Sequence, residues 1–163
     1  MHQIDIKVRG YHLDLYGHVN NARYLEFLEE ARWAYFDDEA DLVAYMHEGF
    51  AFVVVNINIS YRRPALMNEV LTLDTSMHEV GHRSAVIRQV VRHKESGAVV
   101  AEADVTFVLY SERDKRAIVI DGELRALLTP GSPAPVVRRT PFATPWRTIA
   151  ISERAGGLVE SNL

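Results

Sequence analysis

The stretch from Tyr11 to Phe36, YHLDLYGHVNNARYLEFLEEARWAYF, passes from a polar loop into a strongly apolar segment within a dozen residues. Asp14 lies in the loop, residues 17–21 (GHVNN) form a hinge, and a helix is predicted from about Ala22 to Phe36. Asparagine is a favoured N-cap, because its side-chain oxygen accepts a hydrogen bond from a first-turn N–H. The remaining unpaired N–H groups and the helix dipole make this end electropositive. The sequence therefore predicts a carboxylate close to an anion-binding helix end, and this pair is our candidate active site.

The predicted helix is apolar over more than one stripe, so it needs cover on nearly all sides. Its apolar residues are Tyr24, Leu25, Phe27, Leu28, Ala31, Ala34, Tyr35 and Phe36. Its narrower polar face comprises Arg23, Glu26, Glu29, Glu30 and Arg32. Side chains three positions apart on this face can form i,i+3 ion pairs.

Most of the remaining chain up to about residue 128 alternates apolar and polar residues with a period of two, which is typical of half-buried strands. The apolar positions are Ile4, Ile6 and Val8; Val53, Val55, Ile57 and Ile59; Leu71, Leu73 and Met77; Ala85, Ile87 and Val91; and Val99 through Leu109 at odd numbers. Turns are expected at Asn68-Glu69, Gly81, Glu95-Ser96-Gly97 and Glu112-Arg113-Asp114. A short strand from Arg116 to Ile120 and a helix capped by Asp121 and ending near Leu128 follow.

One long apolar helix and a meander of five to six antiparallel strands form an α+β plan. The sheet is expected to curl around the helix, which is the hotdog arrangement. An exposed sheet edge is normally paired or blocked, so we expect a homo-oligomer, either a dimer or a tetramer of two hotdog dimers. Residues 1–129 are assigned to this domain. Residues 130–163 are rich in proline and are predicted to be an extension, docked through Trp146 and the segment 149–151 or flexible.

Composition excludes several classes of function. The net charge of −4 argues against a nucleic-acid surface. A helix needs about 20 consecutive apolar residues to span a bilayer, and no apolar run approaches that length. The chain has no cysteine, which removes thiolate metal sites and a cysteine nucleophile. No apolar signal-peptide core is visible near the N-terminus, so a cytoplasmic location is expected. The histidines lack metal-ligand spacing, so no metal site is predicted.

Asp14 has two interpretations. As a reactive group it would act as a general base for water or as a nucleophile on an acyl carbon. The alternative is a loop aspartate that makes an Asx turn or caps the helix. An oxyanion developing at the helix N-terminus needs an opposed attacking group, and Asp14 is within loop reach of that position.

The neighbouring candidates also have structural alternatives. One of Asn20 and Asn21 is expected to cap the helix. His18 either orients the substrate or Asp14, or bonds a backbone carbonyl. Arg62 and Arg63 either bind phosphate groups or form a surface pair before a proline. Three glutamates of the predicted helix could direct a carboxylate towards the site, but they are more typical of a solvated or ion-paired face; they are Glu26, Glu29 and Glu30.

Two blocks carry a family resemblance: DLYGHVNNARYLEFLEEAR and FVVVNINISYRRPA. Together they resemble the hotdog acyl-CoA thioesterases of the 4-hydroxybenzoyl-CoA thioesterase-like group, in particular the branch of long-chain acyl-CoA thioesterase III. The resemblance covers about residues 3–128. It departs in two places: Asn68-Glu69 stands where a Gly-Asp pair is common, and the segment beyond residue 130 has no recognised counterpart.

The resemblance implies hydrolysis of fatty acyl-CoA to free acid and CoA, with no metal or redox cofactor beyond the CoA carried by the substrate. It places the catalytic aspartate at Asp14 and the amide that polarises the thioester carbonyl at Asn21. His18 and Asn20 belong to the same motif, and Tyr24 would line the pocket. Two other functions stay open: a hotdog hydratase or dehydratase that pairs His18 with Asp14, and a non-catalytic acyl-CoA or acyl-carrier binding module.

Overall fold

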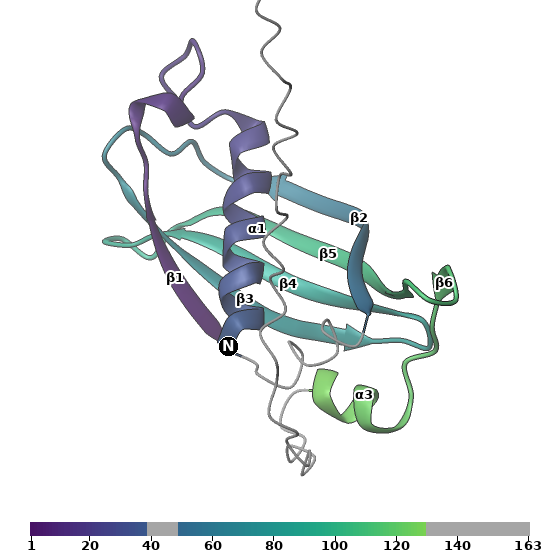
Figure 1. The fold of residues 1–163 in the computed structure, drawn as a ribbon. Coiled ribbons are helices and arrows are strands. Elements are labelled where there is room, and N and C mark those ends of the chain that lie inside the picture. Colours follow the sequence, from purple (N-terminus) through teal and green to yellow (C-terminus); the bar gives the residue numbers. More distant parts are fainter. Residues whose placement is uncertain (39–48, 130–163) are drawn as a thin grey trace, which may run out of the picture.

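The computed structural model describes residues 1–38 and 49–129 (Figure 1). The Pro-containing extension from 130 to 163, including the expected docking of Trp146 and of the segment 149–151, lies outside the described residues. Most of the polar segment expected between Asp37 and Gly49 also lies outside them.

The described chain forms one long helix, one short helix and an antiparallel sheet. In chain order the elements are β1 (His2–Lys7), the 3₁₀ turn η1 (Gly10–His12), α1 (Asn21–Asp38), β2 (Phe50–Tyr61), β3 (Val70–Val80), β4 (Ser84–His93), β5 (Val99–Ser111), β6 (Arg116–Ala117) and α3 (Gly122–Leu128). The strand order is β1-β3-β4-β5-β2, and β6 pairs with β5. Figure 1 shows α1 lying across one face of the curved sheet, with β1 and β2 at opposite edges. The predicted α+β hotdog arrangement with five to six strands is confirmed.

The core lies between α1 and the sheet. The alternating positions predicted to face inward on β3, β4 and β5 are buried, because successive side chains of a strand point to opposite faces. Val99 at the start of β5 is the exception: it is half-buried, and Val100 is buried instead. Tyr24, Phe27 and Leu28 of α1 pack against this face near the start of the helix. Phe36 joins a second apolar cluster, which Leu124 and Leu128 of α3 complete. The helix α3 is confirmed, although the side chain of Asp121 makes no capping hydrogen bond.

One predicted polar position of α1 is buried. Arg32 is only 9% exposed, and its Nη1 donates to Oε1 of Gln89 at 3.0 Å. Gln89 is fully buried on β4; its amide nitrogen donates to the carbonyl of Leu28 at 2.9 Å and to the hydroxyl of Thr75 at 3.1 Å. Arg32 is therefore buried although the sequence places it on the polar face of the helix, because the sheet supplies an amide oxygen that compensates the loss of water. The expected i,i+3 pairing is confirmed by Arg23, whose guanidinium lies 2.7 Å from Glu26.

The helix is less completely covered than expected. Trp33 is 49% exposed and Leu25 is 39% exposed in the described single chain. Within residues 1–38 and 49–129 the sheet contacts one side of α1, so the expectation of cover on nearly all sides is not met by this part of the chain.

The edge strand β2 departs from the predicted alternation. Val53, Val54 and Val55 are 40%, 41% and 57% exposed, although positions 53 and 55 were predicted to face inward. The pairing with β5 shifts register between Val54 and Asn56, and such a bulge changes which side chains share a face. Three consecutive exposed valines therefore mark this edge of the sheet.

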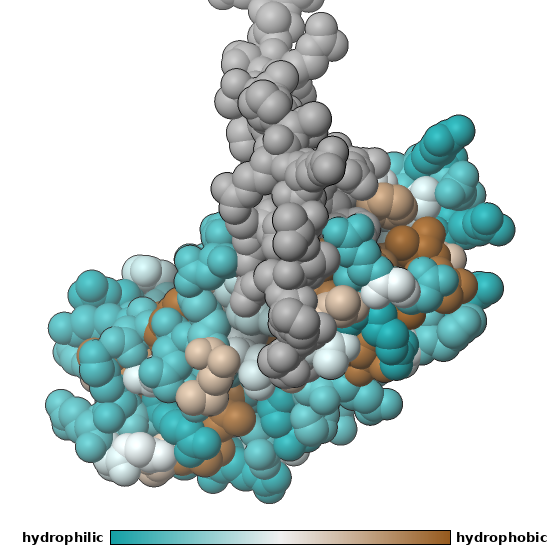
Figure 2. Space-filling model, turned by 90° about the horizontal axis from the view of Figure 1, so that it is seen from below, coloured by the Kyte–Doolittle hydropathy of each residue, from teal (hydrophilic) through white to brown (hydrophobic). Residues whose placement is uncertain are grey.

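The surface is otherwise mainly hydrophilic where Figure 2 shows described residues, with apolar side chains in small patches. No helix within residues 1–38 and 49–129 combines the length and the apolarity needed to cross a membrane.

Candidate active site

The loop before α1 is a tight hairpin. Leu13 and Val19 form an antiparallel bridge, and the N–H of Asp14 donates to the carbonyl of His18 at 2.8 Å. Gly17 turns the chain with φ of +76°, a conformation that glycine adopts without the steric penalty of a side chain. A second bridge joins His18 to Leu66, so the hairpin is held against the segment that follows β2.

Asp14 forms the Asx turn that was its structural alternative. Its Oδ1 accepts hydrogen bonds from the backbone N–H of Tyr16 at 2.8 Å and of His18 at 3.3 Å. No donor among the described residues is bonded to Oδ2. The turn fixes the carboxylate through one oxygen and leaves the second oxygen for chemistry, so the structural and reactive interpretations are compatible.

Asn20 is the N-cap of α1. Its Oδ1 accepts from the N–H of Ala22 at 2.9 Å, and its own N–H donates to the carbonyl of His12 at 2.9 Å. Asn21 is the first helical residue, and its N–H has no acceptor within the described part of the chain. The prediction that one of the two asparagines caps the helix is confirmed, and the first-turn amide at Asn21 is the unpaired donor.

Most of the predicted site residues line one open cleft of about 480 Å³. The lining residues are Asp14, His18, Val19, Asn21, Tyr24, Tyr61, Arg62, Arg63 and Pro64. Among the site residues predicted from the sequence only Asn20 does not line the cleft, because its side chain is directed at the helix start. The carboxylate of Asp14 and the electropositive helix end thus share one cavity.

Tyr61 is a lining residue that the sequence analysis did not single out. Its hydroxyl donates to the carbonyl of Asn21 at 3.0 Å, and its ring meets Tyr24 edge to face with centroids 5.4 Å apart. These contacts tie the end of β2 to the first turn of α1. Burial raises the pKa of Tyr24 to about 12, so this phenol is neutral at physiological pH. The only sequence cue was the position of Tyr61 directly before the Arg62-Arg63 pair.

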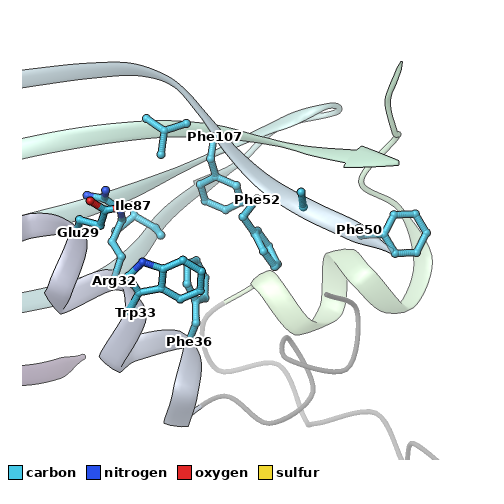
Figure 3. A pocket seen from close by; sticks show the side chains of 10 residues that line it. Glu29, Arg32, Trp33, Phe36, Phe50, Phe52, Ile87 and Phe107 are labelled. Atoms are coloured by element: carbon cyan, nitrogen blue, oxygen red, sulfur yellow. The ribbon is translucent and has the colours of Figure 1, made fainter. Parts of the chain in front are cut away.

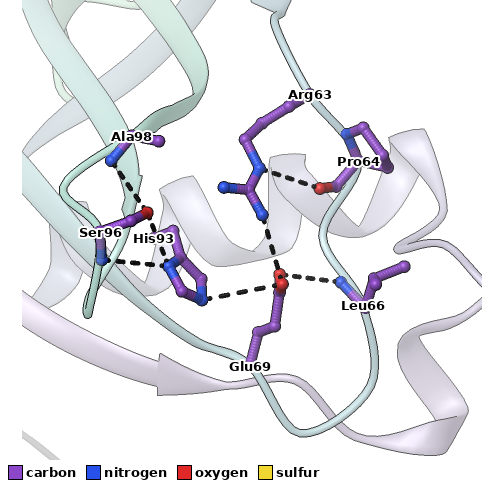
Figure 4. Close-up of polar contacts among 7 residues, drawn as sticks. All are labelled: Arg63, Pro64, Leu66, Glu69, His93, Ser96 and Ala98. Atoms are coloured by element: carbon purple, nitrogen blue, oxygen red, sulfur yellow. Dashed lines mark hydrogen bonds and ion pairs between the residues drawn. The ribbon is translucent and has the colours of Figure 1, made fainter.

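Arg62 and Arg63 are both paired with carboxylates of the same chain. Arg62 forms an ion pair with Glu102. Arg63 lies 3.3 Å from Glu69, whose other oxygen accepts from the N–H of Leu66 at 3.0 Å (Figure 4). A phosphate that binds either arginine must therefore compete with an existing partner. Glu69 belongs to the Asn68-Glu69 pair, where the sequence departs from the family pattern. It fixes Arg63, a residue of the cleft wall, to the backbone of Leu66.

His12 is a buried residue that lies directly before the hairpin. Its Nδ1 accepts from the N–H of Arg9 at 2.9 Å, and its ring packs edge to face on Phe27. Burial is the main cause that lowers the pKa of His12, with a further contribution from Arg23. The neutral ring is therefore the form that fits this position.

We expect acid to destabilise the fold through His12. Because its folded pKa is below the unfolded value of about 6.5, the unfolded chain binds the extra proton first and stability falls as pH drops through 6.5. Asparagine at this position keeps an oxygen for the Arg9 N–H without titrating there. His12→Asn should flatten the decline of Tm between about pH 7 and pH 5. Equal slopes for both proteins would contradict this assignment.

Within the described residues, no hydrogen bond joins the imidazole of His18 to the carboxylate of Asp14, and no group of three acidic, histidine or cysteine side chains could hold a metal ion. The first finding gives no support to a hydratase-type His–Asp pair. The chemistry available in the cleft is a carboxylate opposed to backbone and arginine donors.

Comparison with known proteins agrees with this geometry. The family model of the thioesterase-like superfamily matches residues 8–129. The long-chain acyl-CoA thioesterase FadM of Escherichia coli (strain K12) is 48% identical over 126 residues, which are 77% of this chain and 96% of that protein. The crystal structure of YbaW, a probable thioesterase from Escherichia coli, superimposes with a TM-score of 0.74 at 48% identity and covers 77% of this chain and 95% of that chain. A 1,4-dihydroxy-2-naphthoyl-CoA thioesterase from Synechocystis is 17% identical with a TM-score of 0.67, covers 77% of this chain and 93% of that chain, and shares the fold.

Proposed function

The chain belongs to the thioesterase-like superfamily, and from this premise we propose that it hydrolyses fatty acyl-CoA thioesters to free fatty acid and CoA. The observation that carries the proposal is the shared cleft of Asp14 and the Asn21 amide. FadM, which is 48% identical to this chain, is named as a long-chain acyl-CoA thioesterase, so long-chain acyl-CoA is the substrate class proposed.

The reaction uses the two sides of the cleft. The thioester carbonyl oxygen accepts a hydrogen bond from the Asn21 N–H at the positive end of α1, which favours the negative charge that develops there. Asp14 removes a proton from water as the water attacks the acyl carbon, or attacks the carbon itself in an acyl-enzyme route that water completes. The C–S bond breaks and CoA leaves as a thiolate, so a strong general acid is not required. The proposed route uses no metal or redox cofactor.

The remaining lining residues bind and orient the substrate. His18 orients the substrate or the loop that carries Asp14, Tyr24 forms the wall, and Asn20 sets the helix start. Arg62 and Arg63 bind CoA phosphates by exchanging their carboxylate partners for phosphate oxygens, with which arginine forms bidentate hydrogen bonds.

A thiol-release assay tests the proposal. Purified protein is mixed with saturated acyl-CoAs of about four to eighteen carbons and their enoyl counterparts, and free CoA and enoyl absorbance are followed together. Hydrolysis predicts thiol release that is greatest for the longer chains. A hydratase would change enoyl absorbance without freeing thiol, and a binding module would do neither; either result overturns the proposal.

We also propose a cytoplasmic dimer or tetramer of hotdog dimers. The outer edge of β2 pairs with no other strand among the described residues, and this edge and its three exposed valines support pairing of two β2 strands across a two-fold axis. The absence of cysteine is compatible with a reducing compartment.

A further inference from the structure

A second pocket of about 230 Å³ lies between α1 and β2, away from the Asp14 cleft. It is lined by residues from the second half of α1, the first half of β2 and the sheet, and it has no lining residue in common with the cleft. The walls are largely aromatic; they include Trp33, Phe36, Phe52 and Phe107 (Figure 3). Such walls suit an aliphatic chain.

The polar lining of this pocket is unusual because it includes a buried cation. Arg32 lines the pocket and is buried, yet no carboxylate of the described chain lies within ion-pair distance of it. Among the described residues its side chain makes one hydrogen bond, from Nη1 to Gln89, and Gln89 is itself held by Leu28 and Thr75. An arginine placed by a fully buried amide is fixed in one orientation, whereas a surface arginine is mobile.

The bond through Nη1 leaves the other edge of the guanidinium, Nε and Nη2, without an acceptor in residues 1–38 and 49–129. This edge presents two parallel N–H donors, the geometry that pairs with both oxygens of a carboxylate. Glu29 is the other charged side chain that lines the pocket. It is exposed on α1 and its negative charge acts on Arg32, so it opposes the binding of an incoming anion, although solvent weakens this effect.

We propose that this pocket binds an aliphatic chain ending in a carboxylate, with the chain between the aromatic side chains and the carboxylate on Arg32. The free edge of the guanidinium is not among the fully buried polar atoms that lack a partner, so it is accessible from the pocket. An anion delivered with its own apolar chain can replace water on this edge while the chain fills the apolar part of the pocket. The inference deepens the proposed function, and it rests on that function for the origin of the ligand.

Two sources supply this chemistry. One is the free fatty acid that hydrolysis releases, which would make the pocket a product site. The other is the distal carboxylate of a dicarboxylic acyl chain still attached to CoA, which would make Arg32 a specificity-determining residue. Both sources place the same group on the same guanidinium.

Calorimetric titration of the full chain with octanoate and with 1-octanol tests the binding itself. We expect octanoate to bind at least about tenfold more tightly than octanol, because a hydrogen bond to a charged group stabilises more than a neutral one. Arg32→Met keeps the aliphatic stem and should bring the ratio of the two affinities close to one. Arg32→Lys keeps the charge without the paired donors and should retain only part of the preference.

Two further variants distinguish a binding role from a structural one. Arg88→Met removes an exposed arginine on the sheet that pairs with Asp104, and it should leave the ratio unchanged. Glu29→Gln should raise octanoate affinity and leave octanol affinity unchanged. The proposal is overturned if the parental protein does not prefer octanoate, or if Arg32→Met weakens octanoate and octanol equally, as a packing role predicts.

Kinetics separate the two sources. If the ligand is the free acid, octanoate inhibits dodecanoyl-CoA hydrolysis, and Arg32→Met relieves the inhibition. If the ligand is a distal carboxylate, kcat/KM for dodecanedioyl-CoA exceeds that for dodecanoyl-CoA, and Arg32→Met reverses the order. An Arg32-dependent octanoate preference in a protein that hydrolyses no acyl-CoA would leave the pocket in place and overturn only the proposed function.

Discussion

Asp14→Asn is expected to lower kcat for acyl-CoA hydrolysis by about 100- to 10,000-fold, the range that general acid–base groups contribute. Asparagine has nearly the same size and shape as the aspartate that it replaces. The asparagine oxygen can accept the same hydrogen bonds from Tyr16 and His18 that Oδ1 of Asp14 accepts, so the Asx turn is kept. What is lost is the negative charge and the second oxygen, which is the one without a donor among the described residues.

The measurement is thiol release at saturating substrate, together with Tm by calorimetry. Asp121→Asn is the control: Asp121 sits before α3 and makes no side-chain capping bond, so this change should leave both turnover and Tm unaltered. A near-parental rate for Asp14→Asn would remove Asp14 from the reaction. A large fall in Tm would show instead that the Asx turn depends on the charge.

The site could be predicted where its chemistry is local. Asp14, Asn20 and Asn21 lie close together in the chain, and turn and cap preferences act over such short separations. The sequence therefore indicated a carboxylate near a helix start, and the structure has both in one cleft. The alternating strands were predictable for a similar reason, since a period of two decides which side chains face the helix.

Contacts between distant segments could not be predicted in this way. Tyr61 bonds Asn21 across 40 positions, and Gln89 bonds Arg32 across 57. The helical pattern places an arginine on the polar face, because the pattern depends only on neighbours along the helix. It does not include the hydrogen-bond acceptors of the sheet that packs opposite. The burial of Arg32 was missed for that reason, and the second pocket was missed with it.

The valines of β2 show a different limit. A bulge adds one residue to one strand of a pair, and it reverses the facing of the residues beyond it. Nothing in the run from Val53 to Val55 marks the bulge. The same run reads as a buried strand in sequence and is an exposed edge in the structure.

That edge gives the second large expected effect. Val54→Asp is expected to convert the proposed dimer into monomers at micromolar concentration. In a two-fold pairing of β2 strands each copy contributes its own introduced aspartate, so two carboxylates enter one apolar interface. Burying an unpaired charge costs several kcal/mol and each ~1.4 kcal/mol is tenfold, so the dimer Kd should rise by about a thousandfold or more.

Sedimentation equilibrium over a range of concentrations measures the change. Lys7→Asp is the control, because Lys7 lies on β1 at the opposite edge of the sheet and its side chain is exposed. It should leave the assembly intact. Loss of the dimer in Lys7→Asp but not in Val54→Asp would show that the interface lies at the β1 edge instead.

Antiparallel pairing of two β2 strands also has a consequence for catalysis. It brings the Tyr61 end of β2, beside the Asp14 cleft, towards the Phe50 end of the second copy, beside the aromatic pocket. Val54 also lines the aromatic pocket, so this effect is measured on a Val55→Asp monomer, which should hydrolyse long chains less efficiently than short ones, relative to the parental dimer. Because a short acyl group needs only the cleft, a monomer with an unaltered chain-length profile would show that each chain binds its substrate alone.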